Sequence, residues 1–314
     1  MTFPQPPTPR ALTSPTPNPR LPDAALLFNT VVWGATFVLV KAALHDVSPI
    51  LFLALRFSLA TLALVALFRG AGRGPWSWTS AGAGALAGAF LFSGYALQTL
   101  GLRFTSAPKS AFLTGLTSVM VPLLGALVYK TRPQFSEVVG VLVATAGLGL
   151  MTLEGVTASH GATGSIGRGD ALTLFGAIAF AAYIVTLGHF SGQMSFELLS
   201  VSQIAAAAVL ALSIFWWAET PRLAWRPAVV WAILITGLLC TALAFTIQAW
   251  AQQYTTSTRT ALIYMLEPVF AWITSFLVAG EGLSGRAAVG AALILGGVLL
   301  VEMKPLNSRL HPSQ

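Results

Sequence analysis

The stretch Ala261–Ile273, "ALIYMLEPVFAWI", is apolar except for Glu267, and Pro268 follows this glutamate directly. Proline has no backbone N–H, so Pro268 cannot donate to the carbonyl of Tyr264, and a helix is expected to kink there. Inside hydrocarbon, a freed carbonyl and a carboxylate are tolerated only where protein or water covers them. The stretch therefore predicts a kinked helix with a wet interior face, if the segment lies in a membrane.

The composition of the chain supports a membrane setting. Apolar residues make up 55% of the 314 residues and charged residues only 9%, against about 25% charged in soluble domains. The mean hydropathy of +0.76 agrees, and together these values exclude a soluble globule. The net charge of +7 comes from singly spread basic residues, which argues against a nucleic-acid surface. The single cysteine, Cys240, excludes an internal disulfide and a multi-cysteine metal site.

Apolar runs of about 20 residues, the length that crosses hydrocarbon as a helix, follow one another from residue 24 onward. Helices are favoured because every backbone polar group must be bonded inside lipid. The predicted fold class is therefore an all-α integral membrane protein with ten transmembrane helices. Their expected ranges are 24–44, 48–69, 78–100, 108–129, 135–153, 170–190, 196–216, 228–250, 258–279 and 285–303.

The chain is expected to consist of two related halves, 24–153 and 170–303, joined by a Gly/Ser/Thr-rich linker loop at 154–169. Residues 95–155, shifted by 150, lie over 245–305 without a gap, and this register aligns Gln98 with Gln248. We interpret the register as a duplication. Because each half has five helices, the halves should be inverted repeats around a central cavity.

Both ends of the chain are expected in the cytoplasm of a bacterium, with the helices in its inner membrane. Residues 1–23 form a proline-rich, disordered tail, and 304–314 form a second tail. With the N-terminus inside, the loops of the first half carry six basic residues inside and two outside, as the positive-inside rule requires. The second half shows no such bias.

Three charged residues fall within the predicted spans, where charges are costly and usually functional. Arg56 and Glu267 are expected near the same level, about 12–14 Å deep at ~1.5 Å per residue. Glu267 is a candidate to carry a coupling proton or to bind a cationic group of the substrate, and the alternative is a structural residue or a partner of Arg56. Arg56 has a substrate or gating role or forms a structural ion pair. Lys41 lies close to the outer boundary, where snorkelling explains it equally well.

Polar and aromatic residues in mid-span are further candidates for substrate binding, although each alone is more typical of packing. They are Trp33, Tyr95, Gln98, Tyr183, Gln203, Gln248 and Tyr264. No set of nucleophile, base and orienting group is found, and no nucleotide-binding motif. The sequence therefore predicts no catalytic site, no cofactor and no metal.

The chain resembles the EamA-type permeases of the drug/metabolite transporter superfamily over about residues 24–303. The resemblance rests on "WGATFVLVK" (33–41), Pro49, Arg56, "ALIYMLEPVF" (261–270) and "GAALILGGVLL" (290–300). It implies a basket-like bundle with a central cavity, cytoplasmic termini, and export or exchange of small metabolites such as amino acids. It also places Trp33, Lys41, Arg56, Glu267 and Pro268 at positions typical of the family, without fixing their roles.

The predicted function is a secondary transporter that exports an amino acid or a related amphipathic solute by alternating access. An uncoupled facilitator of the same fold is the first alternative, and a membrane-embedded enzyme acting on a lipid is the second. The expected partners are a small-molecule substrate and the lipid bilayer, with a proton as the candidate coupling ion and no nucleic acid. The protein is expected to act as a monomer or a homodimer.

Overall fold

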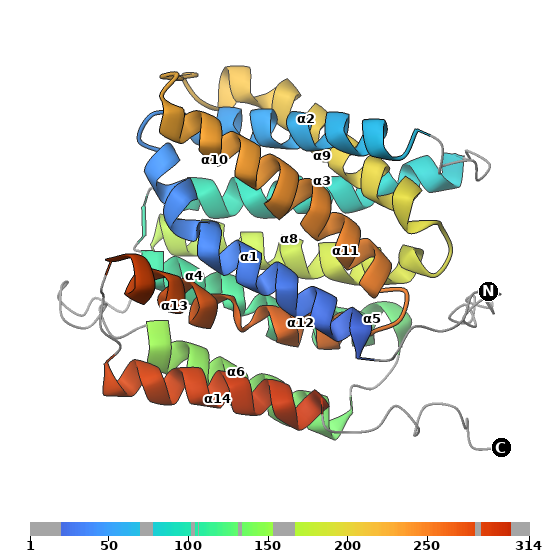
Figure 1. Ribbon diagram of the computed structural model, residues 1–314. Coiled ribbons are helices and arrows are strands. Elements are labelled where there is room, and N and C mark those ends of the chain that lie inside the picture. Colours follow the sequence, from blue (N-terminus) through green and yellow to red (C-terminus); the bar gives the residue numbers. More distant parts are fainter. Residues whose placement is uncertain are drawn as a thin grey trace.

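The computed structural model describes residues 20–69, 78–101, 104–105, 107–130, 134–152, 167–279 and 284–302. Within these ranges the regular elements are helices (Figure 1), and one isolated β-bridge joins Val47 to Leu223. The predicted C-terminal tail lies outside the described residues, as do nearly all of the predicted N-terminal tail and linker loop.

The predicted apolar runs all fall on helices of the structure, with ends within a few residues. The first half contains α1 (Leu21–Ala43), α2 (Pro49–Leu67), α3 (Trp78–Gly101), α4 (Ala107–Gly115), α5 (Thr117–Tyr129) and α6 (Phe135–Thr152). The second half contains α8 (Arg168–Ser191), α9 (Phe196–Ala218), α10 (Pro227–Gly237), the π-helical turn η1 (Leu238–Leu243), α11 (Ala244–Ala251), α12 (Ser257–Tyr264), α13 (Glu267–Ala279) and α14 (Gly285–Glu302). Three runs expected as single helices, 108–129, 228–250 and 258–279, are therefore divided. The sequence predicted a kink only in the last of them.

Several helices are long and apolar enough to cross a membrane. By length and composition, six qualify in the described part of the chain: Pro49–Leu67, Ser80–Gly101, Phe112–Tyr129, Arg168–Ser191, Phe196–Ala218 and Pro227–Ala251. Shorter apolar helices cover Phe135–Met151 and Gly285–Val301. Large apolar side chains such as Leu127, Trp217 and Leu277 point outward and are about three-quarters exposed, as expected for a lipid-facing surface. The chain is a multi-pass membrane protein.

Helices from the two halves of the chain interleave in one stack (Figure 1). α2 packs on α9, α3 on α8 and α9, α1 on α13, and α6 on α14. The main hydrophobic core accordingly contains residues of both halves, such as Phe57 from α2 and Leu199 from α9. The halves therefore do not form separate bodies, and any space at the centre of the stack has walls from both.

α6 and α14 approach each other through glycines. A β-carbon added at Gly147 would overlap the carbonyl oxygen of Gly290, and one added at Gly290 would overlap that of Gly147. Gly140 and Gly297 face each other in the same reciprocal way. Small residues let two helix backbones approach closely in a membrane, and this explains why the two helices pack so tightly.

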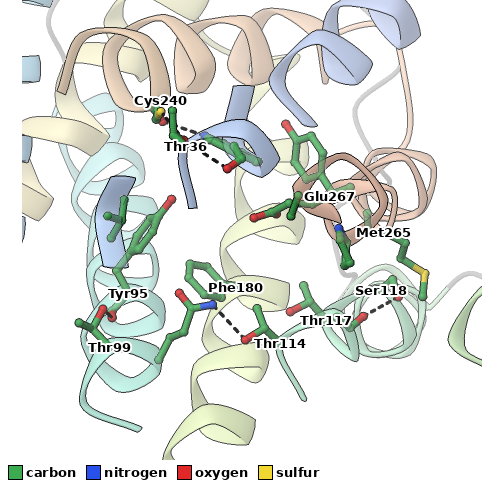
Figure 2. Close-up of a pocket in the computed structure, with 18 of the residues that line it drawn as sticks. Thr36, Tyr95, Thr99, Thr114, Thr117, Ser118, Phe180, Cys240, Met265 and Glu267 are labelled. Atoms are coloured by element: carbon green, nitrogen blue, oxygen red, sulfur yellow. Dashed lines mark hydrogen bonds between the residues drawn. The ribbon is translucent and has the colours of Figure 1, made fainter. Parts of the chain in front are cut away.

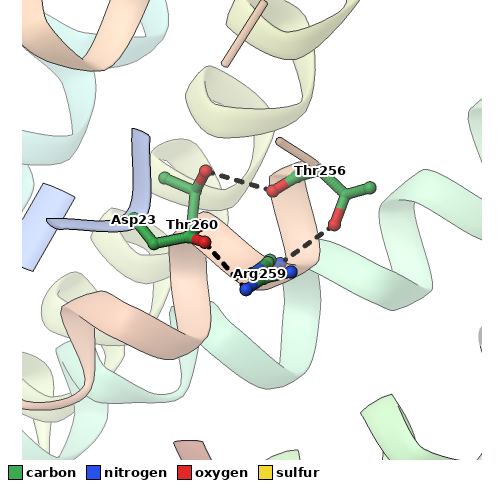
Figure 3. Close-up of polar contacts among 4 residues, drawn as sticks. All are labelled: Asp23, Thr256, Arg259 and Thr260. Atoms are coloured by element: carbon green, nitrogen blue, oxygen red, sulfur yellow. Dashed lines mark hydrogen bonds and ion pairs between the residues drawn. The ribbon is translucent and has the colours of Figure 1, made fainter. Parts of the chain in front are cut away.

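One end of the stack, where α1 and α12 begin, is closed by an ion pair between the halves (Figure 3). Asp23 Oδ2 lies 2.7 Å from Arg259 Nη2, and both side chains are largely buried. Thr256 caps α12, because its hydroxyl accepts the N–H of Arg259 at 3.3 Å and its carbonyl accepts the hydroxyl of Thr260 at 3.1 Å. We name this the Asp23 end.

The opposite end, where α1 ends and α2 begins, is held by hydrogen bonds of the backbone and of the Ser48 hydroxyl. The N–H of Ser48 donates to the carbonyl of Arg222 at 2.9 Å, and the N–H of Arg222 donates to the Ser48 hydroxyl at 3.1 Å. The N–H of Ala224 donates to the carbonyl of Asp46 at 2.8 Å. We name this the Ser48 end, and these bonds fix the α1–α2 connection against the α9–α10 connection.

Candidate functional site

A cavity of about 670 Å³ lies within the stack and has walls from both halves (Figure 2). Along α1 and its C-cap the lining extends from Trp33 to Leu44, and on α2 it includes Phe52, Leu53 and Arg56. On these two helices the lining therefore extends from the middle of the stack towards the Ser48 end. Its aromatic lining consists of Trp33, Phe52, Tyr95, Phe180, Tyr183, Phe245, Tyr264 and Trp272.

The interruption between α12 and α13 brings Glu267 to this cavity. The N–H of Met265 bonds to the carbonyl of Leu262 and that of Leu266 to the carbonyl of Ile263, both at 3.1 Å, so the chain makes a tight turn before α13. Glu267 is the first residue of α13 and Pro268 the second. A helix N-terminus favours a carboxylate. The helix thus breaks just before the Glu267–Pro268 pair that predicts its kink, and both residues line the cavity.

Another interruption, which is the first along the chain and was not predicted from the sequence, separates α4 from α5 at Leu116. Thr117 begins α5, and its hydroxyl donates to the carbonyl of Ala177 on α8 at 3.2 Å. The hydroxyl of Ser118 donates to the carbonyl of Gly115 at 2.8 Å. Thr117 and Ser118 line the cavity near Glu267 (Figure 2). Two half-helices, α5 and α13, therefore begin at the same space.

Arg56 enters the cavity wall from α2 and is only 5% exposed. Its Nε donates to Thr241 Oγ1 at 2.5 Å, and its Nη2 donates to the carbonyl of Cys240 at 3.3 Å and to the Tyr95 hydroxyl at 3.4 Å. The centre of the guanidinium lies 4.8 Å from the ring centroid of Tyr95. Among the described residues, no carboxylate lies within ion-pair distance of Arg56. The Arg56–Glu267 pair considered from sequence is absent from this conformation.

Trp33 holds one wall of the cavity in place. Its Nε1 donates to the carbonyl of Cys240 at 2.9 Å. Its ring lies edge-on to Tyr264, with centroids 4.8 Å apart, and tilted against Phe245 at 5.5 Å. Aromatic pairs in such geometries stabilise packing beyond their buried area. The indole is therefore a fixed part of the wall in this conformation.

The cavity brings together most of the residues predicted from sequence. Those that line it are Trp33, Arg56, Tyr95, Gln98, Tyr183, Gln248, Tyr264, Glu267 and Pro268. Gln98 donates to Thr114 Oγ1 at 3.0 Å, whereas Gln248 donates to Gln252 Oε1 at 3.2 Å. Gln203 is fully buried on α9 and does not belong to the lining. The side chain of Lys41 lies outside the described residues.

Thr117, which lines the cavity, was not singled out from sequence, and neither were Asn29 and Thr241, which bond to the lining residues Tyr264 and Arg56. Asn29 Nδ2 donates to the carbonyl of Ala244 at 2.7 Å and lies 3.5 Å from the Tyr264 hydroxyl. Thr117 stands 150 residues before Glu267, so the register between the halves contained its signal. Asn29 and Thr241 carry no such signal, because their importance comes from contacts between distant segments.

The described residues contain no group of three or more His, Cys, Asp or Glu side chains that is arranged to hold a metal ion. The polar groups of the described lining residues are instead one guanidinium, one carboxylate, hydroxyls, amides, a thiol and indole N–H groups. Such a set can bind a small solute through ionic and hydrogen bonds.

Comparison with known proteins agrees with this architecture. The model of the EamA-like transporter family matches residues 21–153 and again 167–303. An uncharacterized transporter of Archaeoglobus fulgidus is 33% identical over 90% of this chain and 86% of its own length. A probable terminal-alkyne amino-acid exporter of Streptantibioticus cattleyicolor is 26% identical over 92% of this chain and 96% of its own.

The fold also occurs among solved structures. One crystal structure superimposes with a TM-score of 0.73 at 19% identity and covers 89% of this chain and 96% of the other. At that identity the likeness concerns the fold alone. Both relatives cited above are named as transporters or exporters. The chain therefore belongs to the EamA-like transporter family and is a membrane transporter rather than an enzyme.

Proposed function

We propose that this transporter moves a small amphipathic solute through the central cavity by alternating access. The observation that carries the proposal is the presence of Arg56 and Glu267 in one cavity without an ion pair between them. Opposite charges that do not neutralise each other suit a solute with an anionic and a cationic group, such as an amino acid. The volume of about 670 Å³ is also in the usual range for small-molecule sites.

Alternating access is supported by the relation between the halves. The family model matches each half separately, the two helix interruptions lie 150 residues apart, and the glycine contacts of α6 and α14 are reciprocal. We therefore infer ten membrane crossings in two inverted repeats, 24–153 and 170–303. Inverted repeats give a transporter two similar gates that face opposite sides.

With the N-terminus in the cytoplasm of a bacterium, the Asp23 end faces inward and the cavity extends outward. The conformation is then an outward-facing one, in which an exported solute would leave. Loading from the cytoplasm requires the Asp23–Arg259 pair to separate, because it joins the starts of α1 and α12 across the inner end. Export is the direction that the relative named as an amino-acid exporter also supports.

Two functional roles are open to Glu267. The carboxylate either carries a coupling proton or binds the cationic group of the solute, and both roles need an accessible charge at the cavity. The N-terminus of α13 and the lining position of Glu267 are compatible with each. An uncoupled facilitator is the second candidate function, in which the same cavity conducts the solute without a proton.

The test uses purified protein in liposomes. Counterflow of a radiolabelled amino-acid panel is measured for the wild type and for Glu267→Gln, with and without an imposed pH gradient. The matched control is Glu197→Gln at the start of α9, where the same change lies outside the cavity lining. We expect the wild type and the control to exchange at least one amino acid and to respond to the gradient.

The outcomes separate the candidates. If Glu267→Gln exchanges solute but no longer responds to the gradient, Glu267 carries the proton. If exchange itself is lost, Glu267 binds the cationic group. If wild type and variant exchange equally and neither responds, the facilitator is favoured. Absence of any exchange by the wild type would contradict the proposed class of solute.

A further inference from the structure

Arg56 is held by neutral groups on the π-helical turn η1. Two of its acceptors, the Thr241 hydroxyl and the Cys240 carbonyl, belong to this turn, and the third is the Tyr95 hydroxyl on α3. A buried arginine in a membrane usually pairs with a carboxylate, because an uncompensated charge there is costly. Here the guanidinium is oriented without an ion pair to any carboxylate in the described part of the chain.

The π-helical turn makes the Cys240 carbonyl available. The N–H of Ala244 reaches the carbonyl of Leu239, five residues back, rather than that of Cys240, four residues back. The Cys240 carbonyl instead accepts Trp33 Nε1 at 2.9 Å and Arg56 Nη2 at 3.3 Å. Such π-helical turns are rare and occur frequently at functional sites.

Thr241 has a fixed orientation. Its hydroxyl donates to the carbonyl of Thr236 at 2.8 Å, and a hydroxyl has only one hydrogen to donate. Its oxygen therefore faces Arg56 only as an acceptor. Thr241 is also fully buried, so water does not compete for this bond.

The remaining donors of Arg56 are those of Nη1. Arginine has five N–H groups in a planar fork, and the hydrogen bonds to described residues use only Nε and Nη2. The two N–H groups of Nη1 are left for a ligand. A guanidinium fork is suited to a carboxylate, which accepts charge-assisted hydrogen bonds in matching geometry.

We propose that Arg56 recognises a carboxylate of the solute and that Thr241 is the positioning residue that aims the guanidinium at it. This inference rests on the proposed function and adds to it the anionic group that the solute must carry. In this proposal the π-helical turn orients the Arg56 guanidinium through neutral acceptors, so that its positive charge remains available to the solute. A carboxylate side chain of the protein beside Arg56 would orient the guanidinium equally well, but it would compete with the carboxylate of the solute.

The experiment compares acids with amides that differ only in the carboxylate. Inhibition of counterflow by phenylalanine and phenylalaninamide, and by leucine and leucinamide, is measured in proteoliposomes. The variants are Thr241→Val, which keeps the shape but removes the acceptor, and Thr241→Ser, which keeps the hydroxyl. Arg56→Gln and the double variant with Thr241→Val complete a thermodynamic cycle. The matched control is Thr246→Val on α11, whose hydroxyl donates to the carbonyl of Ala242 in η1 and not to Arg56.

We expect the wild type to prefer each acid over its amide. Loss of a hydrogen bond to a charged group should weaken inhibition by the acids about tenfold in Thr241→Val and leave inhibition by the amides unchanged. Thr241→Ser and Thr246→Val should behave as the wild type. In the Arg56→Gln background, Thr241→Val should have no further effect, because its partner is gone.

Each of the other possible results would overturn one component of this proposal. If acids and amides inhibit the wild type equally, recognition of a carboxylate is overturned while transport stands. If Thr241→Val weakens acids and amides alike, or still acts in the Arg56→Gln background, its role is structural and the positioning role is overturned. If the wild type exchanges no amino acid, the proposed function fails and this inference fails with it.

Discussion

The two interrupted helices share a geometry but differ in chemistry. α4 gives way to α5 at Leu116, and α12 gives way to α13 at Met265 and Leu266. The second segments begin with Thr117 and Glu267, and both residues line the cavity. The hydroxyl of Thr117 is bonded to a neighbouring helix, whereas Glu267 has no ion-pair partner among the described residues. The interruption thus provides a place for a polar group in the membrane, and the residue type decides whether that place is charged.

The interruptions also have different local causes. Pro268 is the second residue of α13 and removes the N–H that would bond the Tyr264 carbonyl. Pro122, in contrast, lies inside α5, well after the interruption at Leu116. Gly115 precedes Leu116, and Leu148 packs so closely that a β-carbon on Gly115 would overlap it. The first interruption, at Leu116, therefore has a close contact between helices beside it, whereas the second, before Glu267, has a local cause in Pro268.

The largest expected effect comes from replacing Glu267, at the second interruption, by threonine, the residue type found at the first. Glu267→Thr removes the only charge at the start of either half-helix, and loss of a charged contact to a solute or proton should reduce gradient-driven transport about 10–100-fold. Thr117→Val should change transport less than about threefold, because its hydroxyl bonds to protein. Initial rates in proteoliposomes at matched protein density measure both. Equal losses in the two variants would show that the interruptions act alike.

An intermediate effect is expected from restoring a donor at the second interruption. Pro268→Ala supplies an N–H that can bond the Tyr264 carbonyl, so α12 and α13 can join and Glu267 turns away from its present position. We expect transport to fall about tenfold while thermal stability in detergent stays equal or rises, because the helix gains a hydrogen bond worth about 1 kcal/mol.

The control for this change is Pro122→Ala, which adds an N–H within α5 but leaves the interruption at Leu116 in place. It should keep transport within about threefold of the wild type, since a local hydrogen bond is worth only about 1 kcal/mol. If Pro122→Ala impairs transport as strongly as Pro268→Ala, the proline within α5 matters as much as the second interruption.

The difference between the interruptions explains which parts of the fold and of the site could be predicted from the sequence. Apolar length predicted the helices, because backbone bonding in lipid leaves few alternatives. The Glu267–Pro268 pair predicted a kink, because its cause is local. The interruption at Leu116 and the π-helical turn around Cys240 were missed, because they depend on contacts such as Gly115 with Leu148 and Arg56 with Thr241. Gln203 and Gln248 were both predicted as mid-span candidates, yet only Gln248 lines the cavity.

The smallest expected effect concerns the stability of the first interruption. Thr117→Val removes the hydrogen bond to the carbonyl of Ala177 and should lower the free energy of unfolding by about 0.5–1.5 kcal/mol. Thr117→Ser should retain the bond and the stability. Thr145→Val is the matched control, since its hydroxyl bonds only to Val141 within α6. Thermal unfolding midpoints in detergent measure all three variants. A drop for Thr117→Val that Thr117→Ser reverses assigns Thr117 to holding α5 on α8. Unchanged stability together with impaired transport would instead assign the neutral interruption to the solute, and the contrast with Glu267 would then be one of charge alone.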